Sequence, residues 1–502
     1  MKKYFVGIDI GTQSISTSLC DEKGSLVSEF SVPSNLVIEN ETAFEDAESI
    51  FNNVLLSIKK IIEICDIDAK QIKAIGVDSQ MAGIMAVDDN YNPVGPYDSW
   101  IDTRCSKYTK QIEITLGKKG LKNSGSQYMH SHVSKILLRK YEKPDEYQRI
   151  SKFIQISAFV SGKLCGLKGC DAYTDYTYIH FNVCSKTKEM IYDYELLKLL
   201  NIDVDKLPKI IKPTDVIGKV CKKYQNILGL DDAVVIAGCG DTASSSLSAG
   251  IIKENIAYDV AGTASVFAFG SKKFKPDVKN RTLLYSRSVI DKLYLPLAYI
   301  TGGGLCIKWF SNLTGKTYEE LNFLAENVEN SESNSLIFIP HFYGRSFPKN
   351  DNIKGAFYGL TSATTIGEMY LAILESIAFE YKIYCDILKK SSAIENLDKI
   401  FGVGGGTKSP VFCQTKANIL NTKYYAIDNC NSTSLATAKL AGKASGYIKT
   451  NFNELFKVDE NNCSCYEPNN AKYEKYCEKF KYYMRVIKNL GIERESSVIQ
   501  LP

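Results

Sequence analysis

Two aspartates stand within or shortly after short apolar runs, where a carboxylate can do chemistry. The first is Asp241, which follows the apolar run Ala233–Ala237 and then Gly238-Cys239-Gly240. A carboxylate within hydrogen-bond reach of a hydroxyl can take its proton as that hydroxyl attacks, so Asp241 is the predicted general base. The alternative is an ordinary helix N-cap, because small polar residues and a helical pattern follow it.

The second aspartate, Asp9, lies inside the apolar run Tyr4–Ile10. An unpaired carboxylate in such a strand would cost several kcal/mol, so we expect it to be paired with a cation or with a water-bridged magnesium ion. Magnesium needs only one or two carboxylates when phosphate oxygens supply other ligands. The alternative is an aspartate that stabilises the following turn.

Two Gly-Thr turns could grip phosphate groups with backbone N–H groups and threonine hydroxyls. Gly11-Thr12-Gln13 follows the run Tyr4–Ile10, and Gly262-Thr263 follows the run Ile256–Ala261. The phosphate-binding loop Gly-x-x-x-x-Gly-Lys-Ser/Thr does not occur in the sequence. The Gly-Thr pair is therefore the remaining candidate for phosphate binding, with plain turns as the alternative.

Residues suited to hydroxyl groups follow the apolar run Ile72–Asp78. Gln80 and Asp102 can bond to neighbouring hydroxyls, Trp100 offers an apolar face, and Arg104 can hold Asp102 in place. The alternatives are a core position for Trp100 and a solvated surface charge for Arg104.

A glycine-rich segment follows the predicted strand Ile400–Val403. Its spacing is not that of a dinucleotide fingerprint. Gly405 and Gly406 would instead allow adenine and ribose to approach the backbone closely where a helix begins. A simple turn from strand to helix is the alternative.

The elements that position these residues alternate between strands and helices. Each Gly-Thr turn joins two apolar runs, and the two units lie about half the chain apart, which indicates a duplicated domain. The β-branched runs that end in Gly or Asp are typical of buried strands in a mostly parallel sheet, whose carboxyl ends carry ligands. The spacing of apolar residues over 366–381 predicts a long helix that packs against the core. These patterns favour an α/β fold.

Length and composition favour a globular enzyme with a small-molecule substrate. The 502 residues are enough for two or three domains, and the formal net charge of +4 gives no field that would argue for nucleic acid. The 15 cysteines are scattered along the chain, as expected for reduced thiols. No signal peptide or membrane span is recognisable, so we expect a cytoplasmic protein.

Taken in order, the motifs resemble the FGGY family of carbohydrate kinases along almost the whole chain, and its xylulokinase-like members above all. The most specific match is Gly355-Ala356-Phe357-Tyr358-Gly359-Leu360, followed by Glu368 and Ala372 to Glu375, which is similar to the second signature of that family. The other matching segments, from the N-terminus onward, are Asp9 to Ser14, Ser79 to Gly83, Ser99 to Arg104, Gly238 to Asp241, Gly262-Thr263, Gly302 to Gly304 and Gly404 to Gly406.

The resemblance implies two actin-like (ribonuclease H-like) ATPase domains with a cleft between them. We expect an N-terminal domain over 1–248 with the sugar site and the base, a C-terminal domain over 249–450 with the nucleotide site, and a helical tail over 451–502. The implied cofactors are ATP and Mg²⁺. The implied catalytic residues are Asp241 and Asp9, the latter on the metal; the nucleotide residues are Gly11, Thr12, Gln13, Thr263, Gly304, Gly405 and Gly406; the substrate residues are Gln80, Met81, Trp100, Asp102, Asp241 and Thr242.

The implied reaction is transfer of the γ-phosphate of ATP to a hydroxyl of a ketose, with xylulose or a related pentulose as the first choice. Two sugar-facing positions depart from close relatives: Ala82 replaces a histidine, and Thr242 replaces an amide residue. Glycerol or ribulose therefore stays open as a substrate, and a non-catalytic actin-like ATP-binding protein stays open as another class. A homodimer also stays open.

Overall fold

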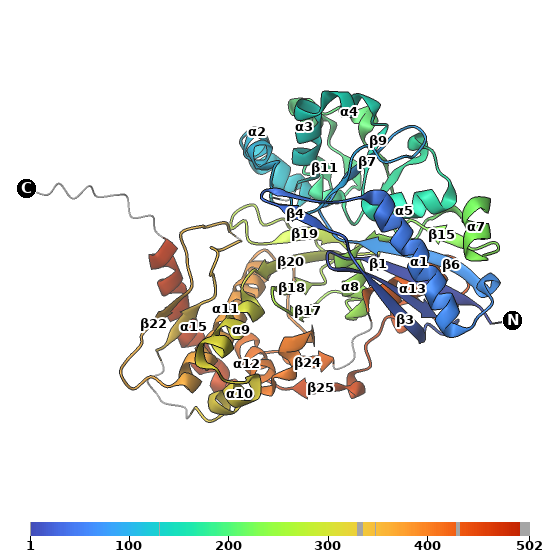
Figure 1. Ribbon diagram of the computed structural model, residues 1–502. Helices are drawn as coiled ribbons and strands as arrows, with labels where there is room; N and C mark the ends of the chain where they lie inside the picture. Colours follow the sequence, from blue (N-terminus) through green and yellow to red (C-terminus); the bar gives the residue numbers. More distant parts are fainter. Residues whose placement is uncertain (1, 130, 329–334, 347, 428–431, 492–502) are drawn as a thin grey trace, which may run out of the picture.

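The computed structural model describes residues 2–129, 131–328, 335–346, 348–427 and 432–491. Two seven-stranded sheets organise this part of the chain, one in each half (Figure 1). The N-terminal sheet contains β1 (Tyr4–Ile10), β2 (Ser14–Cys20), β3 (Leu26–Pro33), β6 (Ile72–Ser79), β14 (Val216–Lys219), β15 (Val234–Ile236) and β16 (Cys239–Gly240). The C-terminal sheet contains β17 (Ile256–Ala261), β18 (Ser265–Phe269), β19 (Leu284–Arg287), β20 (Tyr294–Ile300), β23 (Lys399–Val403), β24 (Lys423–Ile427) and β25 (Cys463–Tyr466).

The two sheets repeat one topology, which confirms the predicted duplication. In the N-terminal sheet β3, β2 and β1 form an antiparallel meander, and β6 and then β15 continue the sheet in parallel. In the C-terminal sheet β20, β18 and β17 form the same meander, and β23 and then β24 continue it in parallel. This order is the one expected of two actin-like, ribonuclease H-like domains.

Helices cover both faces of the N-terminal sheet, which agrees with the almost continuous burial of β1 and β6. α1 (Ala47–Cys65) and α5 (Ile156–Cys165) form one hydrophobic core with it. α13 (Thr433–Ala444) packs against β1, β2 and β6 and shares a second core with α8 (Asp241–Ser248). In Figure 1, α13 lies among the blue strands although it comes late in the sequence.

The C-terminal sheet supports the predicted long helix, which is α11 (Ile366–Lys390). Its neighbours in a large core are α9 (Gly303–Thr314), α10 (Tyr318–Glu326), α12 (Pro410–Leu420) and α15 (Asn470–Gly491). A capping box between Thr365 and Glu368 begins α11 and satisfies N–H groups in its first turn. The helix then buries Tyr370, Ile373 and Tyr381.

The predicted helical tail contributes to the sheet as well. β25 pairs with β24 in antiparallel register and forms one edge of the C-terminal sheet. α15 packs on α12, and the hydroxyl of Tyr483 donates to Glu380 of α11 at 2.9 Å. β25 and α15 are thus part of the C-terminal half, whereas Leu455 and Phe456 join the core that α13 shares with α8 and β1. The boundaries at 248 and 450 stay predictions.

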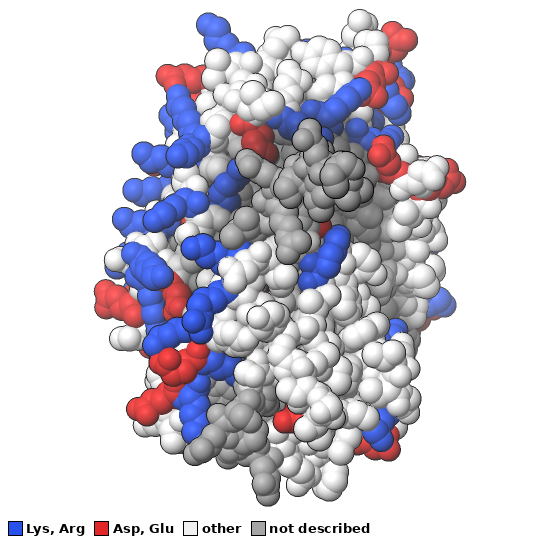
Figure 2. Space-filling model, turned by 90° about the vertical axis from the view of Figure 1, so that its left-hand side faces the viewer, with Lys and Arg blue, Asp and Glu red and all other residues white. Residues whose placement is uncertain are grey.

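Charged side chains are unevenly spread over the surface. Figure 2 shows Lys and Arg gathered along one edge of one face, with Asp and Glu among them, while much of the face is uncharged. Among the residues with described positions, no helix is both long enough and apolar enough to cross a membrane.

Candidate active site

Asp9 and Asp78 lie side by side at the carboxyl ends of β1 and β6. They are direct partners in the parallel register of the two strands. The hydroxyl of Thr433 donates to Oδ2 of Asp9, whereas the buried Oδ1 receives no hydroxyl or amide hydrogen within the described part of the chain and has the Asp78 carboxyl as its neighbour. Burial raises the pKa of Asp9, and the Thr433 hydroxyl opposes that effect. A buried oxygen without a donor is suited to a cation.

Asp241 is the first residue of α8, immediately after β16. The N-cap of α8 is Gly240. Asp241 is therefore not the helix N-cap, which was the alternative role suggested by the sequence. The hydroxyl of Thr242 donates to Oδ1 of Asp241 at 3.2 Å. Burial, and secondarily the negative charge of Asp9, raises the pKa of Asp241 to about 7. A half-buried carboxyl with this pKa can act as a base near neutral pH.

The predicted sugar segment and the first Gly-Thr turn are joined by side-chain hydrogen bonds. Trp100 Nε1 donates to the hydroxyl of Thr12 at 3.0 Å, and that hydroxyl lies 3.5 Å from Oε1 of Gln80. Ser99 donates to the same Gln80 oxygen at 3.2 Å. Trp100 is 39% exposed, which contradicts a core position and leaves its ring available to a ligand.

Met81 lies directly against the strand end that carries the predicted base. A Cβ on Gly240 would lie 2.0 Å from the Met81 sulfur, so the Met81 side chain packs directly on this glycine. Ala82 follows with a positive φ of 61°, a strained conformation for alanine. The Nζ of Lys135 donates to the carbonyl oxygen of Ala82 at 3.3 Å and to that of Ser99, which holds the loop.

Asp102 and Arg104 form the ion pair that the sequence suggested. Arg104 Nε donates to Oδ2 of Asp102 at 2.8 Å, and its NH2 group donates to Asp98 at the same distance. The backbone N–H of Ala43 also donates to Oδ2 of Asp102, at 3.0 Å. Arg104 is therefore not a free surface charge. Asp102 is buried and serves the loop, and its contact with a substrate stays a prediction.

The predicted nucleotide residues of the C-terminal half meet at the carboxyl ends of β17 and β23. The turn Gly262-Thr263 rests on the start of α9, where Gly304 N–H donates to the Gly262 oxygen at 3.1 Å. A Cβ on Gly304 would lie 2.2 Å from that oxygen, and one on Gly406 would lie 2.7 Å from Ala261. Gly405 faces open space, with no atom within 4 Å of its ideal Cβ.

In the first Gly-Thr turn the side chain of Gln13 is exposed to solvent. Gly11 N–H donates to the Ser14 oxygen at 3.0 Å, and Gln13 lies between them. The backbone oxygen of Gln13 accepts from Ser34 at 3.0 Å, which anchors the turn. The predicted residues thus form two groups, one on each sheet.

Sequence reasoning missed the polar residues that connect these elements. Tyr178 bonds to the hydroxyl of Ser79 at 2.7 Å and donates to the Cys239 oxygen at 3.0 Å, so it ties β6 to β16. Thr433 and Thr437 of α13 donate to Asp9 and Asp78. Their spacing of four residues, one helical turn, was the available signal.

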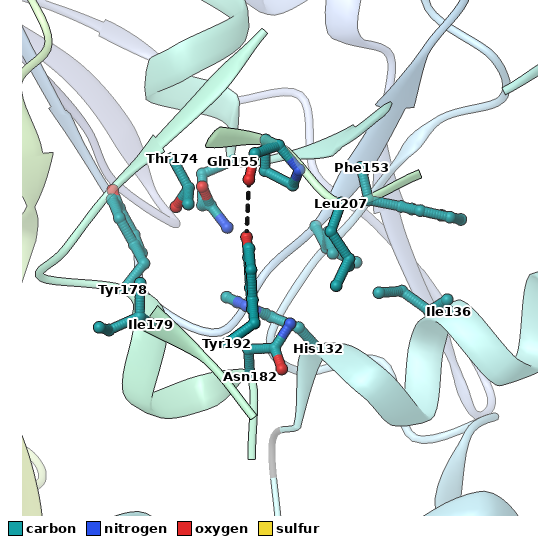
Figure 3. Close-up of a pocket in the computed structure, with 12 residues that line it drawn as sticks. His132, Ile136, Phe153, Gln155, Thr174, Tyr178, Ile179, Asn182, Tyr192 and Leu207 are labelled. Atoms are coloured by element: carbon teal, nitrogen blue, oxygen red, sulfur yellow. Dashed lines mark hydrogen bonds between the residues drawn. The ribbon is translucent and has the colours of Figure 1, made fainter. Parts of the chain in front are cut away.

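A small cavity with mixed polar and apolar lining includes Ile84, just after the sugar segment. Its lining side chains include His132, Gln155, Asn182 and Tyr192, which Figure 3 shows grouped around one space. The cavity volume is about 10 Å³, so it holds one water molecule and not a sugar. Burial lowers the pKa of His132 to about 3, which keeps the imidazole neutral. The substrate must bind elsewhere.

Comparison with known proteins agrees with this geometry. The FGGY family of carbohydrate kinases matches over residues 4–248 as its N-terminal domain and over residues 257–445 as its C-terminal domain. The xylulose kinase of Staphylococcus xylosus is 27% identical over 459 residues, which cover 90% of this chain and 93% of that protein.

Two solved structures resemble the whole molecule. The ligand-bound xylulose kinase of Lactobacillus acidophilus has a TM-score of 0.87 and 25% identity, and the gluconate kinase of the same organism has 0.88 and 25%; each comparison covers 98% of this chain and 99% of the other. A non-catalytic actin-like protein is thus disfavoured. With both domains matched and both sheets in place, the chain belongs to the FGGY family of carbohydrate kinases and is an ATP-dependent sugar kinase.

Proposed function

We propose that the enzyme transfers the γ-phosphate of ATP to a hydroxyl of xylulose or a related pentulose, with Asp241 as the general base. The observation that carries this proposal is the placement of Met81 against Gly240, which sets the sugar segment beside Asp241. Trp100 and Gln80 then border the same space through Thr12. A ketose held there presents a hydroxyl to the carboxylate.

In the proposed reaction the sugar hydroxyl oxygen forms a bond to the γ-phosphorus as the bond to the ADP oxygen breaks. Asp241 accepts the hydroxyl proton, and the products are a sugar phosphate and ADP. The hydroxyl of Thr242 orients the carboxylate through its bond to Oδ1. Because catalysis of phosphoryl transfer depends mainly on positioning and on electrostatic stabilisation of the transition state, the protein must hold both reactants in line.

The nucleotide is proposed to bind between the two Gly-Thr turns. Gly11, Thr12 and Gln13 on one side and Thr263 with Gly304 on the other would supply N–H and hydroxyl donors to the phosphates. Gly405 and Gly406 would border the adenosine, since the ideal Cβ of Gly405 meets open space. This arrangement requires the two halves to approach one another.

Asp9 fits a magnesium ion that arrives with ATP. Its Oδ1 is a hard oxygen ligand that lacks a donor in the described part of the chain. One carboxylate plus phosphate oxygens satisfies the preferences of Mg²⁺. The ion would neutralise charge on the phosphates, while Thr433 keeps the other carboxylate oxygen of Asp9 in place.

Gluconate is the second candidate, because a gluconate kinase is as similar in structure as a xylulose kinase. Its carboxylate would favour a cationic site. The cations placed at this segment are already engaged: Arg104 pairs with Asp98 and Asp102, Arg139 pairs with Asp98, and Lys135 donates to backbone oxygens. A neutral ketose is therefore preferred.

A substrate panel tests the proposal directly. Xylulose, ribulose, gluconate and glycerol are each offered with ATP and Mg²⁺, and ADP release is followed in a coupled assay. We expect the highest kcat/KM with xylulose or ribulose. A preference for gluconate or glycerol would overturn the ketose assignment while leaving the kinase class intact.

A further inference from the structure

Helix α13 contacts the N-terminal sheet at backbone distance. Gly7 of β1 and Gly76 of β6 are partners in the parallel register, and both face this helix. A Cβ on Gly7 would lie 1.9 Å from the Ser434 oxygen, and one on Gly76 would lie 3.0 Å from the Thr437 oxygen. The two glycines therefore let α13 pack closely enough for its short side chains to reach the strands.

Because α13 packs this closely, two threonines one helical turn apart can form hydrogen bonds with residues of the strands. Thr433 donates its hydroxyl to Oδ2 of Asp9, and Thr437 donates its hydroxyl to Oδ2 of Asp78. Both aspartates follow the paired glycines by two residues, so they point to the same face of the sheet. One face of one helix thus binds both carboxylates.

The same face is bonded to the helix that begins with Asp241. The hydroxyl of Ser244 in α8 lies 2.7 Å from the hydroxyl of Thr437 and donates to the backbone oxygen of Thr433 at 3.0 Å. Ser244 is three residues after Asp241, hence on the adjoining turn of α8. A continuous set of contacts therefore runs from β1 and β6 through α13 to α8.

We propose that Thr437 and Ser244 are positioning residues that, with Thr433, hold Asp9 and Asp241 in fixed relative geometry for phosphoryl transfer. The inference rests on the proposed roles of those two aspartates. Neither Thr437 nor Ser244 bonds to them directly, and each acts through α13 or α8. A transfer in which charge and position do most of the catalysis is sensitive to such displacement.

Packing alone does not account for these hydroxyls. The other buried residues along α13 include Ala436, Ala438 and Ala441, which show that small apolar side chains fill the interface with the sheet. The hydroxyl groups of Thr433, Thr437 and Ser244 add directional hydrogen bonds to this interface. Each is buried or partly buried and has a defined partner.

The test compares Thr437→Val, Thr437→Ser and Ser244→Ala with the wild type, using ATP and the best sugar of the panel. Thr437→Val keeps the side-chain shape and removes the hydroxyl. We expect kcat to fall roughly 10- to 100-fold in Thr437→Val, with little change in KM for either substrate, and Thr437→Ser to restore most of it. Ser244→Ala should lose less, because Asp78 keeps its donor.

Ser246→Ala is the matched control. Ser246 is buried in α8, the helix of Ser244, but its hydroxyl donates to the backbone oxygen of Ala243 within α8 at 2.7 Å. It should retain wild-type kcat. In the double variant Thr437→Val with Ser244→Ala, kcat should fall further than in Thr437→Val alone, because Ser244 also donates to the backbone oxygen of Thr433, which Thr437→Val leaves intact.

Three outcomes would overturn the proposal. They are a wild-type kcat in Thr437→Val, equal losses of kcat and of affinity for both substrates, and failure of Thr437→Ser to restore activity. Asp241→Asn, measured in parallel, separates this inference from the proposed function. If Asp241→Asn is inactive while Thr437→Val and Ser244→Ala are normal, only the positioning network is refuted; if Asp241→Asn stays active, both proposals fall.

Discussion

Among single residues, Asp241 has an environment that differs from that of an ordinary surface aspartate. Burial and the charge of Asp9 raise the pKa of Asp241 to about 7, so the group changes protonation within the physiological range. Thr242 and Met81 fix its surroundings through a hydrogen bond and a close contact.

The pH dependence of kcat/KM follows from this pKa. Below pH about 7 the Asp241 carboxyl holds its proton and cannot accept another, so kcat/KM should fall about tenfold per pH unit on the acid side. Above that pH the carboxylate is ionised and the rate should level off. Initial rates between pH 5.5 and pH 9 measure this fall of kcat/KM on the acid side. The fall should be missing from the residual activity of Asp241→Asn. A flat profile in the wild type would exclude Asp241 as the base.

At the scale of elements, much of the fold could be predicted because local patterns report strands and turns. The strands Tyr4–Ile10 and Ile256–Ala261 and both Gly-Thr turns were read from apolar runs bounded by glycine, and the structure has both strands with those bounds. The strand after the first Gly-Thr turn begins at Ser14, one residue before its first apolar residue, Ile15, because polar Ser14 already pairs with β3.

The position of α13 could not be predicted from the same patterns. Its periodicity reports one apolar face but not which sheet covers that face, and Thr433 meets Asp9 across 424 positions of the chain. The pair Gly7 and Gly76 was the available signal for a close backbone approach, yet a glycine in a strand can equally mark a bulge. The strand β25 was missed because its neighbours in sequence are polar.

Thr263→Val tests the second Gly-Thr turn. Thr263 is exposed, so the change should not disturb folding, but it removes a hydroxyl proposed to donate to a charged phosphate. We expect the Kd for ATP to rise about 10- to 100-fold and sugar binding to stay normal, as measured by calorimetry on each ligand. Equal weakening of both ligands would indicate misfolding or a different role.

Gly405→Ala tests the proposed adenosine segment without straining the fold. The added Cβ meets no atom within 4 Å, so the melting temperature should not change. If adenosine approaches this backbone, the methyl group should occupy its space and raise the Kd for ATP several-fold. Unchanged ATP affinity at an unchanged melting temperature would remove Gly405 from the nucleotide site.

At the scale of the whole molecule, the two groups of site residues lie on different sheets, Thr12 on one and Thr263 on the other. A nucleotide bound to both turns would bridge the two halves, and we expect them to approach one another when it binds. Closure would also exclude water, which otherwise competes with the sugar hydroxyl for the γ-phosphate. Helix α13 connects the two halves, because it follows β24 of the C-terminal sheet in sequence and packs on the N-terminal sheet.

Small-angle scattering tests this closure. We expect the radius of gyration to decrease when sugar and a non-hydrolysable ATP analogue are bound together, and to change less with either ligand alone. Without sugar, ATP should be hydrolysed at a low but measurable rate, because water can reach the γ-phosphate in an open site while the closed arrangement that speeds transfer has not formed. An unchanged radius of gyration, with binding of both ligands demonstrated by calorimetry, would count against closure.

The most direct test of the central claim is to identify the products made by the wild type and by Asp241→Asn. Phosphorus NMR after incubation with xylulose, ATP and Mg²⁺ should show one sugar phosphate ester per ADP for the wild type. For Asp241→Asn the rate should drop by a factor on the order of 10² to 10⁴, with ATP binding retained. The exposed Asp231, outside the site, supplies the control variant Asp231→Asn, which should match the wild type. Wild-type rates of ester formation in Asp241→Asn, or release of inorganic phosphate at the same rate with and without sugar, would contradict the account.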